Sequence, residues 1–226
     1  MYWDSTIIIL IPAIIFSIAA QIMVKSAFSE YSKVRNSRGL TGADAAREIL
    51  DRNGLTNVRI EHISGSLTDH YDPKANVIRL SDDVYGSATV AAVGVAAHEA
   101  GHAVQYAEGY YPIKIRNAII PVTRFGSSLS TPLVILGLAL SWDFLITAGI
   151  LLFCAVVLFQ AITLPVEFNA SGRALKTLRS SHFLEDDEMK GARSVLTAAA
   201  MTYVAAMLSA LLSLVRLLVI SGRRRR

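Results

Sequence analysis

Four long apolar runs and one largely polar stretch organise the chain. Residues 6–24 form an apolar run of 19 residues with one glutamine and no charged side chain. Three more apolar runs cover residues 119–141, 144–166 and 195–221. About 20 apolar residues in a helix cross the hydrocarbon core of a bilayer, so the pattern predicts four transmembrane helices.

Charged residues at the ends of these runs fit the same interpretation. Arg124 and Arg216 lie near run ends, where a long side chain can reach the membrane interface. A cleaved signal peptide would begin with a basic segment, whereas Met1–Ser5 contains Asp4 and no lysine or arginine. The first run is therefore expected to be a retained anchor.

The polar stretch at residues 32–118 can build a small water-soluble subdomain. Thr41 followed by Asp44 is a capping-box pattern that opens a helix. Ser87 is expected to cap a longer helix rich in alanine and valine, over about residues 87–108. Short β-branched or alternating segments between turn residues predict strands at 58–60, 67–71 and 77–80. The expected fold class is a mainly α membrane protein with a small α+β, zincin-like subdomain.

Composition narrows the class of protein. Hydrophobic residues make up 53% of the 226 residues and charged residues 18%, below the ~25% of an average soluble domain. A disordered chain, a coiled coil and a nucleic-acid binder are poor interpretations of this balance. Cys154, the one cysteine, excludes an intrachain disulfide framework and lies in an apolar run, where a buried thiol is inert.

Lysine and arginine positions suggest an orientation. Four spans place residues 25–118 and 167–194 on one side of the membrane. Ten cations near the helix ends lie on that side, whereas the other side has only Arg223–Arg226. The positive-inside rule then predicts that the polar subdomain is cytoplasmic in a multi-pass cell-membrane protein, although the arginine tail argues the other way.

The sequence His98-Glu99-Ala100-Gly101-His102 lies in the last helix predicted for the polar stretch. Histidines at i and i+4 share one helix face and can bind one tetrahedral zinc ion. Glu99 projects about 100° away, beside the open zinc position, where it can accept a proton from a water molecule activated by the metal. Two buried, hydrogen-bonded histidines are the alternative interpretation.

A catalytic zinc ion has three protein ligands and an open position, so a third ligand is needed. Glu108 lies ten residues after His98, where HExxHxxGxxH zincins have their third ligand, but Gln105 replaces the glycine that turns the chain. The helix should then continue and carry Glu108 away from the metal. Glu167, at the end of the third apolar run, is the preferred ligand, and an ion pair with Arg173 is its alternative role.

Residues around this glutamate extend the site. A helix that begins near Pro165 would present Glu167 and Ser171 on one face. Ser171 could then hold a ligand histidine by a hydrogen bond.

Several motifs resemble those of the bacterial YugP-type membrane zinc metallopeptidases. They are His-Glu-Ala-Gly-His at 98–102, Leu-Thr-Asp-His-Tyr-Asp-Pro at 67–73, Leu-Pro-Val-Glu-Phe-Asn-Ala-Ser at 164–171, and Ala-Ala-Ala-Met-Thr-Tyr-Val-Ala-Ala at 198–206. The resemblance covers nearly the whole chain. It implies a gluzincin-like site with one zinc ion on His98, His102 and Glu167 and with Glu99 as general base. The similar HtpX-type proteases have an acidic residue at the position of Ser171, so the resemblance does not define how the ligands are supported here.

Two further features of a peptidase remain open in the sequence. A donor is needed for the oxyanion that forms on the scissile carbonyl, and Tyr203, His182 and His70 are candidates. Residues 77–80 could be an edge strand that pairs with an extended peptide, or a strand in the middle of the sheet.

The sequence therefore predicts an integral-membrane zinc metallopeptidase that cleaves membrane or membrane-proximal proteins. Its expected partners are a peptide or membrane-protein substrate and the lipid bilayer, and no nucleic acid. A non-catalytic membrane scaffold stapled by zinc is the alternative, and Glu99 argues against it because a structural zinc site has no need of a base. The substrate and the oligomeric state do not follow from the sequence.

Overall fold

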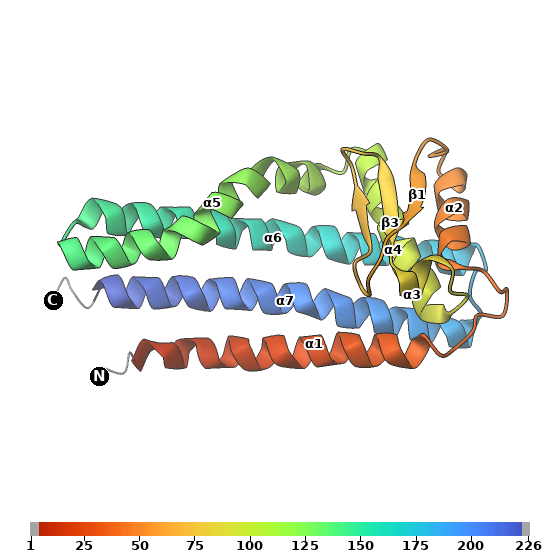
Figure 1. The fold of residues 1–226 in the computed structure, drawn as a ribbon, viewed down its shortest axis with the longest axis horizontal. Helices are drawn as coiled ribbons and strands as arrows, with labels where there is room; N and C mark the ends of the chain where they lie inside the picture. Colours follow the sequence, from red (N-terminus) through yellow and green to blue (C-terminus); the bar gives the residue numbers. More distant parts are fainter. Residues whose placement is uncertain (1–4, 223–226) are drawn as a thin grey trace. The chain divides into compact units, whose positions relative to one another are not determined.

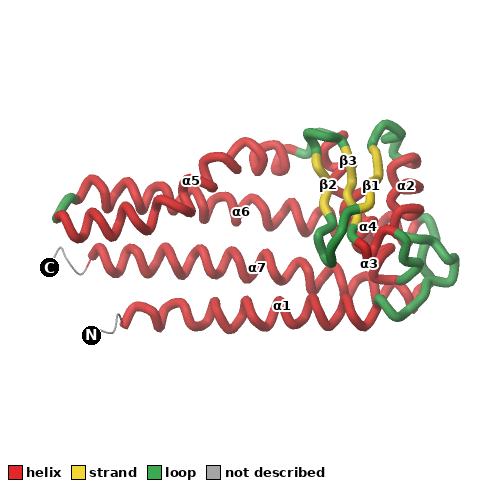
Figure 2. Tube along the Cα trace, in the orientation of Figure 1, coloured by secondary structure: helices red, strands yellow, loops and turns green. Residues whose placement is uncertain are grey.

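The computed structural model describes residues 5–222, and most of them are helical (Figures 1 and 2). A 3₁₀ turn, Ser5–Leu10, leads into the first α-helix. The helices are α1 Ile11–Tyr31, α2 Gly42–Arg52, α3 Asp82–Tyr85, α4 Val90–Ala107, α5 Tyr111–Leu140, α6 Asp143–Ser180 and α7 Asp186–Gly222, and the strands are β1 Arg59–His62, β2 His70–Asp72 and β3 Val77–Leu80. Met1–Asp4 and the arginine tail used in the orientation argument lie outside the described residues.

Four helical segments in the described part of the chain are long and apolar enough to cross a membrane. They are Ser5–Tyr31, Tyr111–Leu140, Asp143–Ser180 and Asp186–Gly222. All four extend well beyond their apolar runs, because an apolar run marks only the part of a helix suited to lipid. Pro165 lies inside α6 and does not begin a helix, so the expected helix start at this residue is wrong.

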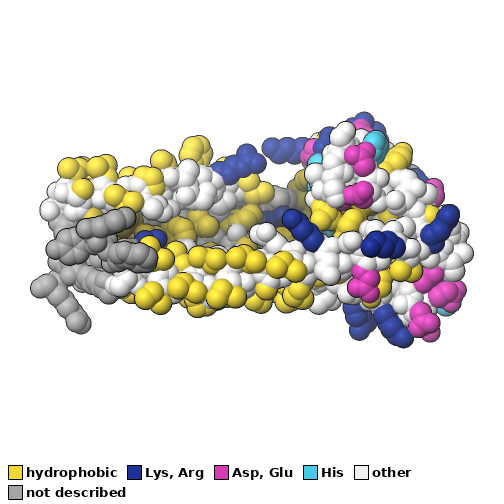
Figure 3. Space-filling view, turned by 60° about the horizontal axis from the view of Figure 1, so that its bottom comes forward, with side chains coloured by type: hydrophobic (Ala, Val, Ile, Leu, Met, Phe, Trp, Pro, Cys, Tyr) yellow, Lys and Arg dark blue, Asp and Glu magenta, His cyan; other side chains and the backbone are white. Residues whose placement is uncertain are grey.

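The chain divides into two compact units. The first consists of Met1–Ala20, Pro112–Pro165 and Thr202–Arg226, and the second of Gln21–Tyr111 and Val166–Met201. In Figure 3 hydrophobic side chains cover the helices of the first unit, and most of the visible charged side chains lie over elements of the second. This division follows the composition, since the first unit contains most of the apolar runs.

Small residues allow close helix contacts in the first unit. A Cβ atom on Gly126 would lie 2.8 Å from the Leu152 carbonyl oxygen, and one on Gly149 would lie 2.7 Å from that of Ser130. Only glycine fits at such distances, so α5 and α6 approach each other closely, as small residues permit in membrane helix pairs.

The second unit has a hydrophobic core built around α4. Fourteen of the 18 residues of this helix are buried, because alanine, valine and glycine form most of its length. The helix begins after Thr89, whose Oγ1 accepts a hydrogen bond from the Ala92 amide at 3.3 Å. Ser87 is therefore not the cap, and its prediction as such is wrong. Thr89 directly precedes Val90, the first residue of α4, and therefore occupies the N-cap position of this helix.

The sheet of the second unit has the strand order β1-β3-β2. β3 pairs in parallel with β1 and antiparallel with β2. Residues 77–80 form this strand as predicted, but they lie in the middle of the sheet and not at its edge. Of the two positions left open for these residues, the middle of the sheet is the one they occupy, because β1 and β2 take the outer positions. β2 contacts α4.

Candidate metal centre and active site

Two elements of the second unit carry the candidate ligands. α4 presents His98 and His102 one turn apart, and α6 presents Glu167. The helices can approach because Gly101 has no side chain. A Cβ atom at this position would lie 2.9 Å from the Ala170 carbonyl oxygen. The small residue inside the HExxH sequence therefore determines how closely the two ligand-bearing helices pack.

The three candidate ligands converge on one point. Glu167 Oε2 lies 3.3 Å from His98 Nε2 and 3.4 Å from His102 Nε2. All three ligand atoms lie within 4.8 Å of one another. The Glu167 side chain is 2% exposed, and the two histidine side chains are 13% and 11% exposed. A carboxylate buried to this extent needs positive charge beside it.

These distances fit the donor set of a catalytic zinc site. Ligand atoms about 2.0–2.1 Å from a tetrahedral ion lie roughly 3.3–3.4 Å apart. A direct charge-assisted hydrogen bond between imidazolium and carboxylate would be shorter, about 2.7–2.9 Å. Two nitrogen donors and one carboxylate oxygen are also ligands that zinc accepts. The residues therefore suit a zinc ion with one open position.

Neighbouring side chains fix the orientation of both imidazoles. Ser171 Oγ lies 3.1 Å from His98 Nδ1, and Gln105 Oε1 lies 3.0 Å from His102 Nδ1. Each His Nδ1–H can donate to its oxygen partner, and each Nε2 then keeps a lone pair for a metal ion. This is the usual support of a metal-binding histidine.

Gln105 also connects α4 to α6. Its Nε2 donates to the Val166 carbonyl oxygen and to Asn169 Oδ1, both at 2.9 Å. The Arg173 guanidinium donates to the same Asn169 oxygen at 2.7 Å. The amide nitrogen of Gln105 thus donates to α6, while its amide oxygen accepts from the His102 imidazole on α4. The side chain is completely buried.

Sequence reasoning missed Gln105 and Asn169 as supporting residues. Gln105 stood out only as the residue that replaces a zincin glycine, and Asn169 only as part of the Glu-Phe-Asn motif. The available signal was their spacing: a polar residue three positions after His102 and another two positions after Glu167, each close to a ligand on its own helix.

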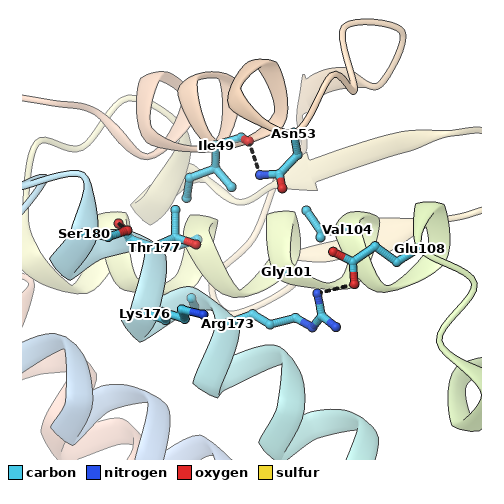
Figure 4. A pocket seen from close by; sticks show the side chains of 11 residues that line it. Ile49, Asn53, Gly101, Val104, Glu108, Arg173, Lys176, Thr177 and Ser180 are labelled. Atoms are coloured by element: carbon cyan, nitrogen blue, oxygen red, sulfur yellow. Dashed lines mark hydrogen bonds and ion pairs between the residues drawn. The ribbon is translucent and has the colours of Figure 1, made fainter.

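Glu108 lies outside the cluster of ligand atoms. Its carboxylate forms an ion pair with the Arg173 guanidinium at 2.7 Å, and its side chain is 55% exposed. The partnership with Arg173 that was the alternative role for Glu167 is therefore made by Glu108. The pair borders a cavity of about 200 Å³ in which Gly101 and Val104 of α4 face Thr177 of α6 (Figure 4).

Glu99 is nearly buried, with 8% of its surface exposed. Burial of the His102 imidazole lowers the pKa of this group, but the adjacent Glu167 carboxylate oxygen and the negative charges of Glu99 and Glu167 outweigh that effect. The net pKa of His102 is raised in the metal-free protein. The site thus has the excess negative charge that a divalent cation neutralises.

The candidate oxyanion donors differ in their placement. His70 lies on β2, where its Nδ1–H donates to the Thr68 carbonyl oxygen at 2.9 Å and its Nε2 faces Arg79. His182 follows the end of α6 at Ser180, 13 residues after Glu167. At about 1.5 Å per residue, this end of α6 lies some 20 Å along the helix from Glu167. His182 is therefore too far from the metal ligands to donate a hydrogen bond to the oxyanion. Tyr203 belongs to the first unit and stays a prediction.

Comparison with known proteins gives three findings. A family described as "Putative neutral zinc metallopeptidase" matches residues 6–222. A relative from Bacillus subtilis (strain 168), named "Putative membrane protease YugP", is 49% identical over 214 residues, which is 95% of each chain. No solved structure matches the chain.

Proposed function

The chain belongs to the neutral zinc metallopeptidase family, and from this premise we propose that it is a gluzincin-like peptidase of the cell membrane. His98, His102 and Glu167 would hold one zinc ion, with Glu99 as the general base. The observation that carries the proposal is the placement of Glu167 Oε2 at 3.3 and 3.4 Å from the two Nε2 atoms, the spacing of tetrahedral zinc ligands.

A zinc ion at this site would lower the pKa of a water molecule toward 7 and polarise the scissile carbonyl. Glu99 lies on the ligand helix one residue after His98, so its carboxylate can take the proton of the attacking water. The same carboxyl group can return that proton to the amine that leaves. Ser171 and Gln105 keep the imidazoles in the required tautomer throughout.

The substrate would be an extended peptide. β2 is an outer strand that contacts the ligand helix α4, so a peptide could pair with its free edge and present a peptide bond near the ligands. Tyr203 would serve as the oxyanion donor, and a zincin-like subdomain would be formed by the sheet and α2–α4. Because the chain carries four candidate membrane helices, the substrates would be membrane or membrane-proximal proteins, cleaved on the cytoplasmic face.

Metal analysis and activity measurements on variants of the histidines and of three glutamates test the proposal. Purified wild type should contain about one zinc ion per chain, and His98→Ala and His102→Ala should lose it. Glu99→Gln should keep the metal but reduce turnover of a panel of membrane-protein substrates by at least ~10²-fold, because only the proton acceptor is removed.

Glu167→Gln and Glu108→Gln are the matched pair for the third ligand. Glu167→Gln should lose zinc affinity and activity together, whereas Glu108→Gln should keep both. The opposite pattern would mean that the third ligand is local and the assignment wrong. Activity that survives in Glu99→Gln would exclude this hydrolytic mechanism, and zinc binding without any turnover in wild type would favour the zinc-stapled scaffold.

A further inference from the structure

A chain of three polar side chains leads from the protein surface to one of the candidate metal ligands. The Arg173 guanidinium donates from Nε to Asn169 Oδ1 at 2.7 Å, and Gln105 Nε2 donates to the same oxygen at 2.9 Å. Gln105 Oε1 lies 3.0 Å from His102 Nδ1. All of these residues belong to the second unit. The support of His102 thus extends beyond Gln105 to a charged residue.

The two amides in the middle of this chain could each be turned end for end. A side-chain amide carries an acceptor oxygen and a donor nitrogen of nearly equal size, so its hydrogen-bond partners decide which of them faces which neighbour. Arginine leaves no choice, because its guanidinium has N–H donors and no acceptor. The donor at Arg173 therefore requires the oxygen of Asn169, and not its nitrogen, at the point that Gln105 also contacts.

This orientation passes along the chain to the imidazole. The amide nitrogen of the buried Gln105 has two acceptors, Asn169 Oδ1 and the Val166 carbonyl oxygen, both at 2.9 Å. If the Asn169 amide turned over, its nitrogen would face the nitrogen of Gln105, and buried donors would be left unpaired. With the amide held as it is, Gln105 Oε1 faces His102 and accepts only if Nδ1 carries the proton. The Nε2 lone pair of His102 is then available to a metal ion.

A second set of contacts holds the guanidinium in place. It forms the ion pair with Glu108 at 2.7 Å (Figure 4), and its Cζ lies 6.0 Å from the centre of the Tyr110 ring. The Arg173 side chain is 28% exposed and that of Glu108 is 55% exposed, so the pair itself contributes little to stability. Of the two polar contacts, only the one with Asn169 leads to the metal ligands.

We propose that Arg173 is a positioning residue of the metal site. It orients the Asn169 amide, and this amide keeps Gln105 in the orientation that preserves the metal-binding tautomer of His102. The proposal deepens the proposed peptidase function and rests on it, because it needs a zinc ion at the proposed ligands. A cation near a divalent metal ion repels it, so loss of this charge alone would strengthen zinc binding. A positioning role predicts the opposite sign.

Zinc affinity of the purified full-length protein, measured by competition with a chelator, tests the proposal. Arg173→Met keeps an unbranched side chain but removes the donor, and zinc binding should weaken about 10-fold, as for other groups that orient a metal ligand. Glu108→Gln is the matched control: it breaks the same ion pair but leaves the donor to Asn169, and it should bind zinc as tightly as wild type. Asn169→Leu removes the middle of the chain and should also weaken binding about 10-fold, so the test does not depend on the stability of Arg173→Met.

A rescue experiment distinguishes orientation from a merely structural role of Arg173. In Asn169→Asp both side-chain oxygens are acceptors, so either orientation offers Gln105 an acceptor and no donor is needed to select one. Arg173→Met combined with Asn169→Asp should therefore bind zinc no more weakly than Asn169→Asp alone. The added carboxylate is present in both of these proteins, so its own attraction for zinc cancels in the comparison.

Three results would overturn the proposal. They are wild-type zinc affinity in folded Arg173→Met or Asn169→Leu, an equal loss of affinity in Glu108→Gln, and the same loss from Arg173→Met with and without Asn169→Asp. A wild-type protein that binds no zinc would overturn the proposed function and this proposal with it. The two failures are therefore distinguishable, because the three results above leave zinc binding by wild type intact.

Discussion

Gln105 connects three parts of the candidate site through one side chain. Its oxygen lies beside the His102 imidazole, and its amide nitrogen donates to Asn169 and to the Val166 carbonyl next to Glu167. A buried amide with both ends satisfied fixes its neighbours, because any rotation would leave a polar group unpaired. Gln105 therefore positions one metal ligand relative to the helix that carries another.

Gln105→Leu should weaken zinc binding about 10–100-fold, as expected for the loss of a group that orients a metal ligand. The unfolding free energy should also fall by about 1–3 kcal/mol, since buried donors and acceptors lose their partner. Competition with a zinc chelator and denaturant unfolding measure the two effects. Ser171→Ala is the comparison: His98 is slightly more exposed, so water can replace the hydroxyl and the loss should be smaller. Unchanged zinc affinity in Gln105→Leu would contradict this role.

The sequence predicted the site unevenly at this scale. His98, Glu99 and His102 stand out because a metal-binding pair on a helix needs a fixed spacing of four residues. Glu167 was proposed because it stands at the end of an apolar run, on the side expected for the HExxH helix, and four residues before Ser171. Gln105 and Asn169 could not be predicted as partners, since they lie 64 residues apart and their contact depends on the packing of α4 against α6.

Packing between α4 and α6 is the element-scale feature on which the site depends. Gly101 lies between the two histidines and faces the Ala170 backbone, which follows Glu167 by three residues. Any side chain at this position would push α6 and its carboxylate away from the imidazoles. The distance between the helices and the ligand geometry are therefore coupled.

Gly101→Ala should destabilise the protein by about 1–3 kcal/mol, because a methyl group 2.9 Å from a carbonyl oxygen overpacks the interface. Intrinsic helix propensity alone would have the opposite effect, because alanine in place of glycine raises the free energy of unfolding by about 1 kcal/mol. Gly172→Ala, on the partner helix α6, is the matched control. A Cβ atom meets nothing within 4 Å at Gly172, so the gain in stability from helix propensity should be observed there. Thermal unfolding and zinc content distinguish them, and a stabilised Gly101→Ala protein that retains its zinc would refute the coupling.

Helices and strands were predictable from sequence to different degrees. Residues 77–80 form β3 as predicted, because β-branched residues between turn signals leave few alternatives. Their central place in the sheet was not predictable, since strand order depends on which pairings bury most apolar surface. The lengths of α6 and α7 were underestimated, because no proline interrupts the residues that follow the apolar run of α6 or those that precede the run of α7. Pro165 itself is accommodated inside α6.

At the scale of the whole molecule, two kinds of surface alternate along one chain. The segments of the first unit are suited to lipid, and the second unit contains the sheet, the metal ligands and most of the charged residues. Glu167 directly follows the apolar run 144–166 of its own helix. The proposed peptidase activity next to the bilayer is compatible with this order.

Orientation in the membrane is the last prediction, and it follows from the distribution of cations. Four spans would place residues 25–118 and 167–194 on a single side, which would then have ten lysines and arginines near the helix ends. This side should be cytoplasmic, because positively charged loops are retained there. In a background with Cys154 replaced by alanine, Lys74→Cys should resist a membrane-impermeant maleimide in intact cells and react after lysis. Ser141→Cys, in the turn between α5 and α6, should react in intact cells. The reverse pattern would mean that the four terminal arginines, and not these ten cations, determine the orientation.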